Sequence, residues 1–81
     1  MPRKYYRIVS SKDAVRRARI IAGFTSAELS EEIGISRPML SSIENGAGTT
    51  VKTAHKIAGA LKRPFEDLFE VQDIRPSHVG A

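Results

Sequence analysis

The sequence predicts a compact all-α domain of five short helices, with a segment near each end that could form a short β-strand. Three observations predict this class. Apolar residues recur at intervals of three and four, hydroxyl residues stand where helices would begin, and glycines stand where several would end. We expect a basic arm or strand over residues 1–9, a helical domain over 10–70 and a tail over 71–81.

The first helix is expected to begin after Ser10 or Ser11, either of which could act as its N-cap. Gly23 suits the left-handed residue that often follows a helix. Between these limits several residues follow the helical repeat and are expected to face inward. They are Ala14, Val15, Ala18, Ile21 and Ala22.

The second and third helices have clear end signals. Thr25 is a natural N-cap, and Glu28 stands three residues later, which is the spacing of a capping box. Gly34 would end this helix after about two turns. Ser36 would cap the third helix, and Gly46 would end it because glycine readily takes a positive φ angle.

A fourth helix is expected after Thr49 or Thr50, and a short fifth helix from Pro64 through Glu70. The inward stripe of the fourth helix is Val51, Ala54, Ile57, Ala58 and Leu61. Residues 4–9 and 69–72 are rich in β-forming types. These two segments could pair with each other, pair with another subunit, or be loosely ordered.

The charge of the chain is unevenly distributed. Thirteen Lys and Arg residues against nine Asp and Glu give a formal net charge of +4. Residues 1–22 hold seven basic groups and one acidic group, so their balance is +6, whereas the remainder balances at −2. A basic end of this kind suits contact with a polyanion, but a simply solvated N-terminus has the same composition.

Several classes of protein are excluded by composition. Cysteine is absent, which excludes disulfides and thiolate sites, and no apolar run is long enough for a membrane span or a signal peptide. His55 and His78 stand far apart with no carboxylate pair at ligand spacing, so we expect no metal. No nucleophile motif or phosphate-binding loop appears. We expect a stand-alone cytoplasmic protein without cofactor or enzymatic activity.

The segment 24–46 is the most informative part of the chain. Ser30 is small where two helices must approach closely, and Gly34 makes the sharp turn between them. Their shared apolar inside is Leu29, Ile33, Ile35, Leu40 and Ile43. The outer face of the following helix is left polar. This arrangement is typical of a helix-turn-helix, whose second helix enters the major groove of DNA.

These residues resemble a known family. Gly-Ile-Ser-Arg at 34–37 and Ile-Glu-Asn-Gly at 43–46 are similar to motifs of the Cro/repressor-type (Xre-like) helix-turn-helix regulators of phages and bacteria. The resemblance covers roughly residues 11–70. It implies a transcriptional regulator of double-stranded DNA, most simply a repressor that binds an inverted-repeat operator as a homodimer.

The resemblance also implies which residues read bases. The positions on the recognition helix, residues 37–45, are Arg37, Pro38, Met39, Ser41 and Ser42. Arg37 could hold the O6/N7 edge of a guanine with two hydrogen bonds. Ser41 and Ser42 discriminate more weakly, and Pro38 and Met39 offer apolar contact, for example to a thymine methyl group.

Phosphate contacts are implied at Thr25, Ser26 and Asn45, and Arg19 could also reach a phosphate. Ser26 stands where the family often has a longer glutamine. The loop over 46–50 lacks the basic residues common there, so its contacts would pass to other cations. The candidates are Lys52, Lys56 and the basic arm of Arg3, Lys4 and Arg7.

Two further expectations follow from the family. Its members pair an arginine near the end of the first helix with the acid of the Glu-Asn-Gly motif, which predicts an Arg19–Glu44 salt bridge. Two independent surface charges are the simpler alternative. Lys62 stands where a helix-ending glycine is usual, so the turn into Pro64 is expected to be strained or different.

Similar domains have other roles, which leave two further functions open. An antitoxin would bind a partner protein and also repress its own operon. A control factor of a phage or mobile element would instead bend DNA during recombination.

Overall fold

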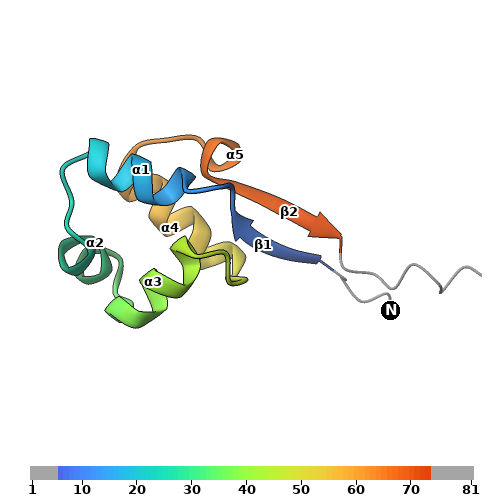
Figure 1. The fold of residues 1–81 in the computed structure, drawn as a ribbon, viewed down its shortest axis with the longest axis horizontal. Coiled ribbons are helices and arrows are strands. Elements are labelled where there is room, and N and C mark those ends of the chain that lie inside the picture. The colour runs from blue at the N-terminus through green and yellow to red at the C-terminus, as the bar shows by residue number, and fades with distance from the viewer. Residues whose placement is uncertain (1–5, 74–81) are drawn as a thin grey trace, which may run out of the picture.

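Five helices follow one another between two short strands in the computed structural model, which describes residues 6–73 (Figure 1). The elements in chain order are β1 Tyr6–Ser10, α1 Ala14–Ile21, α2 Ser26–Ile33, α3 Arg37–Glu44, α4 Val51–Leu61, α5 Phe65–Leu68 and β2 Phe69–Asp73. The predicted class, a five-helix domain with short terminal strands, is confirmed.

The two strands pair with each other, which is one of the arrangements that the sequence left open. They are antiparallel, with Ile8 opposite Val71 and Ser10 opposite Phe69. β1 is also held from its other side, because the N–H of Thr49 donates to the carbonyl oxygen of Ile8 at 2.9 Å. Ile8 and Val9 are buried, so the ladder is anchored on the helical core.

All five helices contribute to one apolar core. Its fully buried large side chains come from α1, α2, α3 and α4, and α5 adds Leu68. The large side chains with essentially no exposed surface are Val15, Leu29, Leu40, Ile43 and Ile57. Two of these belong to α3, so the helix expected to read DNA is fixed to the core along one side.

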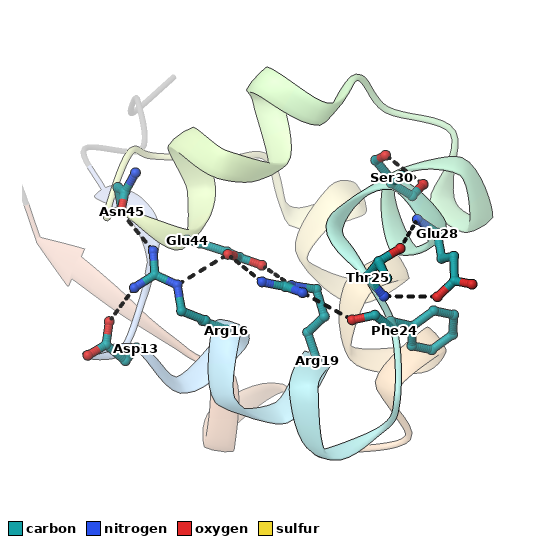
Figure 2. Close-up of polar contacts among 10 residues, drawn as sticks. Asp13, Arg16, Arg19, Phe24, Thr25, Glu28, Ser30, Glu44 and Asn45 are labelled. Atoms are coloured by element: carbon teal, nitrogen blue, oxygen red, sulfur yellow. Dashed lines mark hydrogen bonds and ion pairs between the residues drawn. The ribbon is translucent and has the colours of Figure 1, made fainter.

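The helix ends predicted around α2 and α3 are confirmed. At Thr25 both halves of the capping box form, since Glu28 N–H donates to Thr25 Oγ1 at 3.0 Å and Thr25 N–H donates to Glu28 Oε1 at 2.9 Å (Figure 2). Ser36 Oγ accepts from the N–H of Met39, and Thr50 is the N-cap of α4. Gly34 closes α2 with φ +77°.

The beginning of α1 was predicted wrongly. Neither Ser10 nor Ser11 caps the helix; Asp13 stands at the N-cap position with φ +55° and makes no capping bond through its side chain. The reason is tertiary pairing, because Ser10 is the last residue of β1 and the N–H of Ser11 donates to the carbonyl oxygen of Leu68. Two or three residues are then needed to turn from the strand into the helix.

Three residues predicted to face inward are exposed instead. Ile21 has 72% and Val51 has 46% of its surface exposed, and Ala22 is also exposed. All three lie at helix ends, where the neighbouring element does not extend far enough to cover them. The fifth helix also ends at Leu68 rather than Glu70, because Phe69 pairs with Ser10 as the first residue of β2.

Lys62 closes α4 in the left-handed conformation, with φ +57°. A residue with a Cβ atom is disfavoured there by about 1–2 kcal/mol, which exceeds the extra chain entropy that glycine loses on folding. Lys62→Gly is therefore expected to raise the free energy of unfolding by about 0.5–1 kcal/mol in urea titration. Lys56→Gly, in the exposed interior of the same helix, should lower it by about 1 kcal/mol. Equal destabilisation by both variants would contradict a strained helix end.

Candidate nucleic-acid interface

The turn between α2 and α3 brings the two helices into close contact. Ser30 has 3% of its surface exposed, and its Oγ donates to the carbonyl oxygen of Ala27 at 3.0 Å (Figure 2). Its own carbonyl accepts from the N–H of Ile35 at 2.9 Å, which closes the turn over Gly34. A larger side chain at Ser30 would occupy space that the neighbouring helices fill. The small residue and the left-handed glycine together set the crossing of the helix pair.

Burial of one side of α3 determines which of its side chains face outward. Leu40 and Ile43 are three residues apart and both lie in the core. The five residues suggested as base contacts are all exposed, and they come from the remaining sides of the helix. They are Arg37, Pro38, Met39, Ser41 and Ser42. The first turn of α3, at Arg37 and Pro38, is the end farther from the strands (Figure 1).

Two shallow hollows flank α3 and bring several of the suggested residues together. On one side, Ser26 at the start of α2 lines a hollow with Arg37, Pro38 and Ser41. On the other side, Arg7 of β1 lines a second hollow with Met39 and Ser42. The structure thus places one suggested phosphate contact next to the base contacts on each side of the helix.

Arg7 reaches this surface because the loop after α3 passes close to β1. A Cβ atom at Gly48 would lie 3.7 Å from both Cβ and Cδ of Arg7, in ordinary contact. The loop over residues 46–50 carries no cation of its own. The strand therefore supplies the positive charge that the loop lacks.

The start of α2 offers hydrogen-bond donors to an anion. Thr25 Oγ1 accepts a backbone hydrogen bond in the capping box, and this leaves its hydroxyl proton free to donate. Ser26 follows in the first turn, at the positive end of the helix dipole. Ser26 also lines the hollow that holds Arg37.

Arg19 and Glu44 form the best-buried ion pair of the described residues. Arg19 Nε donates to Glu44 Oε2 at 2.7 Å, and their side chains are 12% and 4% exposed (Figure 2). The Nη1 atom of Arg19 donates to the carbonyl oxygen of Phe24 at 3.0 Å. One guanidinium thus joins α1, the loop before α2 and the end of α3.

Arg16 is a functional candidate that sequence reasoning missed. Its Nε lies 3.5 Å from Glu44 Oε1, and its Nη2 donates to Asn45 Oδ1 at 3.0 Å. With its oxygen facing Arg16, the exposed amide of Asn45 points its NH₂ group away from Arg16, so this group could donate to a phosphate (Figure 2). The signal was present in the spacing, because Arg16 and Arg19 lie three residues apart on one helix face.

The remaining suggested cations are not all gathered at this surface. Lys52 is exposed at the start of α4, where it lines a separate hollow with Val51, His55 and Lys56. Arg3 and Lys4 lie outside the residues that the structure describes. Within residues 6–73, no three His, Asp or Glu side chains are grouped as a metal site, and no helix is long and apolar enough to cross a membrane.

Comparison with known proteins identifies the family of the chain and a similar fold. The sequence profile of the helix-turn-helix family matches residues 15–68, which is more than half of the chain. The fold is similar to that in the crystal structure of the transcriptional regulator VanUg (form II), with a TM-score of 0.63. The two chains are 16% identical, and the alignment covers 90% of this chain and 95% of that one. No curated protein matches the sequence. The chain belongs to the Cro/repressor-type (Xre-like) helix-turn-helix family of DNA-binding regulators.

Proposed function

We propose that this protein is a sequence-specific repressor of transcription that binds an inverted-repeat operator as a homodimer. The observation that carries the proposal is the exposed outer surface of α3, which is held rigidly by Leu40 and Ile43 in the core. A helix fixed in this way can present side chains to base edges in the major groove. The similarity of the fold to a protein described as a transcriptional regulator supports the same role.

In this proposal Arg37 is the main determinant of specificity for the DNA sequence. It is the only basic residue of α3 and it is exposed, so it can donate two hydrogen bonds to the O6 and N7 atoms of guanine. Ser41 and Ser42 add weaker hydrogen bonds to neighbouring base pairs. Pro38 and Met39, which is 50% exposed, would contact apolar groups such as the methyl group of thymine.

Phosphates would be bound on both sides of α3. Thr25 and Ser26 donate from the start of α2, and the amide of Asn45 donates from the end of α3. Cations would come from the N-terminal arm with Arg3 and Lys4, from Arg7 on β1 and from Lys52 on α4. Arg19 would act through Glu44 and Phe24, because little of its side chain is exposed.

A dimer is proposed because one recognition helix covers only a few base pairs. Two copies related by a two-fold axis would read two half-sites about 34 Å apart, one helical turn of DNA. Occupying a promoter in this way would block transcription.

The test is the sequence preference of Arg37→Ala. DNA selected from a random pool by the wild-type protein gives the operator, and the affinity of the variant is then measured for each single-base change. Loss of Arg37 is expected to cost about 1–3 kcal/mol of binding free energy, about 5- to 150-fold, and to relax specificity at one base position in each half-site. Arg17→Ala, an exposed arginine on α1, is the matched control and should leave the preference unchanged. An unchanged base preference in Arg37→Ala would contradict the assignment of α3 as the reading helix.

A further inference from the structure

A groove between α1 and α5 has a floor of two nearly buried apolar side chains and one strongly exposed isoleucine beside it. Ala18 of α1 and Leu68 of α5 lie at its base, and Ala14 and Ile21 of α1 line it along one side. Ile21 has 72% of its surface exposed, although it belongs to the apolar repeat of the helix. A partner that packed on Ile21 would remove this apolar surface from water. We call this feature the α1–α5 groove.

The edge of the α1–α5 groove is positively charged. Lys12, Arg17 and Arg63 line it, and Asp67 is the single acidic residue among the lining side chains. Lys12, Arg17 and Arg63 are exposed, and none of the three takes part in a salt bridge within the described residues. Three cations and one carboxylate therefore surround the groove, which leaves it with a local charge of +2.

The α1–α5 groove lies away from the surface proposed to bind DNA. In Figure 1, α1 and α5 lie along the upper side of the molecule, and α3 lies along the lower side. The cations of the α1–α5 groove are therefore not placed to contact the phosphates beside α3. A partner seated in this groove would leave the recognition helix free.

We propose that the α1–α5 groove binds a short acidic amphipathic helix of a partner protein. Apolar side chains spaced by three and four residues would pack on Ile21 and Ala14, while glutamates or aspartates on the flanks would pair with Lys12, Arg17 and Arg63. α1 spans eight residues, or about 12 Å, so the bound helix would make contact over about two turns.

A second copy of the chain fits this groove poorly. The acidic helix surface with the most carboxylates that it could offer is the outer side of α2, which carries Glu28, Glu31 and Glu32. The apolar residues of α2, Leu29 and Ile33, are buried in its own core. Its exposed apolar side chain is the small Ala27, so that helix could supply the charges but little apolar contact.

The probe for this proposal is a fluorescein-labelled 14-residue helical peptide with leucine at i, i+3, i+4 and i+7 and glutamate elsewhere. A second peptide has lysine in place of every glutamate. Fluorescence anisotropy with the full chain is expected to show binding of the glutamate peptide with a Kd below about 1 mM, and no binding of the lysine peptide. Failure of the glutamate peptide to bind, or equal binding of both peptides, would overturn the proposal.

Three variants locate the binding surface. Arg17→Glu and Ile21→Ser are each expected to weaken binding of the glutamate peptide about tenfold or more, since one reverses a charge at the edge and the other removes apolar contact. Lys56→Glu makes the same charge change at an exposed position of α4 and should have little effect on binding of the peptide. Circular dichroism checks that each variant is folded. Unchanged binding in both groove variants contradicts the proposal.

Sedimentation of the wild type and of Arg17→Glu separates this proposal from self-association. Both proteins are expected to have the same oligomeric state, and both are expected to bind the selected operator. If Arg17→Glu alone turned a dimer into a monomer, the α1–α5 groove would be an interface between copies, and the proposed partner would be wrong. Because the peptide measurement contains no DNA, its outcome does not depend on the proposed function.

Discussion

Glu44→Ala is expected to lower the free energy of unfolding by about 3 kcal/mol or more, because it removes one partner of a buried ion pair. The side chain of Glu44 is 4% exposed and that of Arg19 is 12% exposed, so the guanidinium left behind would be poorly solvated. Arg16 would lose the same carboxylate, but it is 41% exposed and can turn toward water. The whole domain has an expected stability of about 4–12 kcal/mol at its length of 81 residues, so this loss is a large share.

Urea titration followed by circular dichroism measures the effect. The free energy of unfolding of a domain of this size falls by about 1–2 kcal/mol per molar urea. The urea concentration at the midpoint of unfolding should therefore fall by roughly 1.5–3 M. Glu44→Gln keeps one acceptor for Arg19 and should lose less stability than Glu44→Ala. Glu32→Ala, an exposed glutamate on α2, is the matched control and should change stability by less than about 0.5 kcal/mol. A Glu44→Ala protein as stable as Glu32→Ala would show that the pair contributes nothing.

The ion pair also links stability to the geometry of the DNA-binding surface. Arg19 holds the carbonyl of Phe24, which directly precedes the N-cap of α2, and Glu44 is the last residue of α3. The two helices that would meet DNA are therefore both tied to α1 by a single guanidinium. For this reason we expect Glu44→Gln to weaken operator binding even under conditions in which the variant is fully folded.

Local rules predicted the helix-turn-helix well because its signals are contained within a few residues. The capping box at Thr25, the N-cap at Ser36 and the left-handed Gly34 each depend on neighbours no more than four positions away. Leu29 and Ile33 stay in the core for a similar reason, since the helical repeat places them on one side. These features determine the crossing of α2 and α3.

The errors fall where distant parts of the chain meet. Ser10 pairs with Phe69, 59 positions along the chain, and this pairing both removes Ser10 as a cap and shortens the fifth helix. The exposure of Ile21 and Val51 depends on how far the neighbouring elements extend. The apolar repeat within one helix carries no information about this. Arg16 was missed for the same reason, because its contacts to Glu44 and Asn45 join α1 to the end of α3.

Operator binding is expected to weaken steeply with salt, because four cations of each copy are proposed to displace counterions from phosphates. These are Arg3, Lys4, Arg7 and Lys52. Eight such contacts in a dimer predict a slope of log K against log salt of about −7, or a loss of about 10⁴-fold between 50 and 200 mM salt. Thr25, Ser26 and Asn45 are neutral donors, so they add affinity without adding to this slope.

Replacing Arg3, Lys4 and Arg7 together by glutamine removes six of the eight cations in a dimer. The slope is expected to flatten to about −2, which is a loss of only about tenfold over the same range of salt. Base preference should not change, because phosphates carry no sequence information. The matched control replaces Lys12, Arg17 and Arg63 by glutamine. This change lowers the net charge by the same amount, but the three residues line the groove on the far side from α3. If both triple variants flattened the slope to the same extent, net charge alone would govern binding, and the arm would have no specific contact with the phosphates.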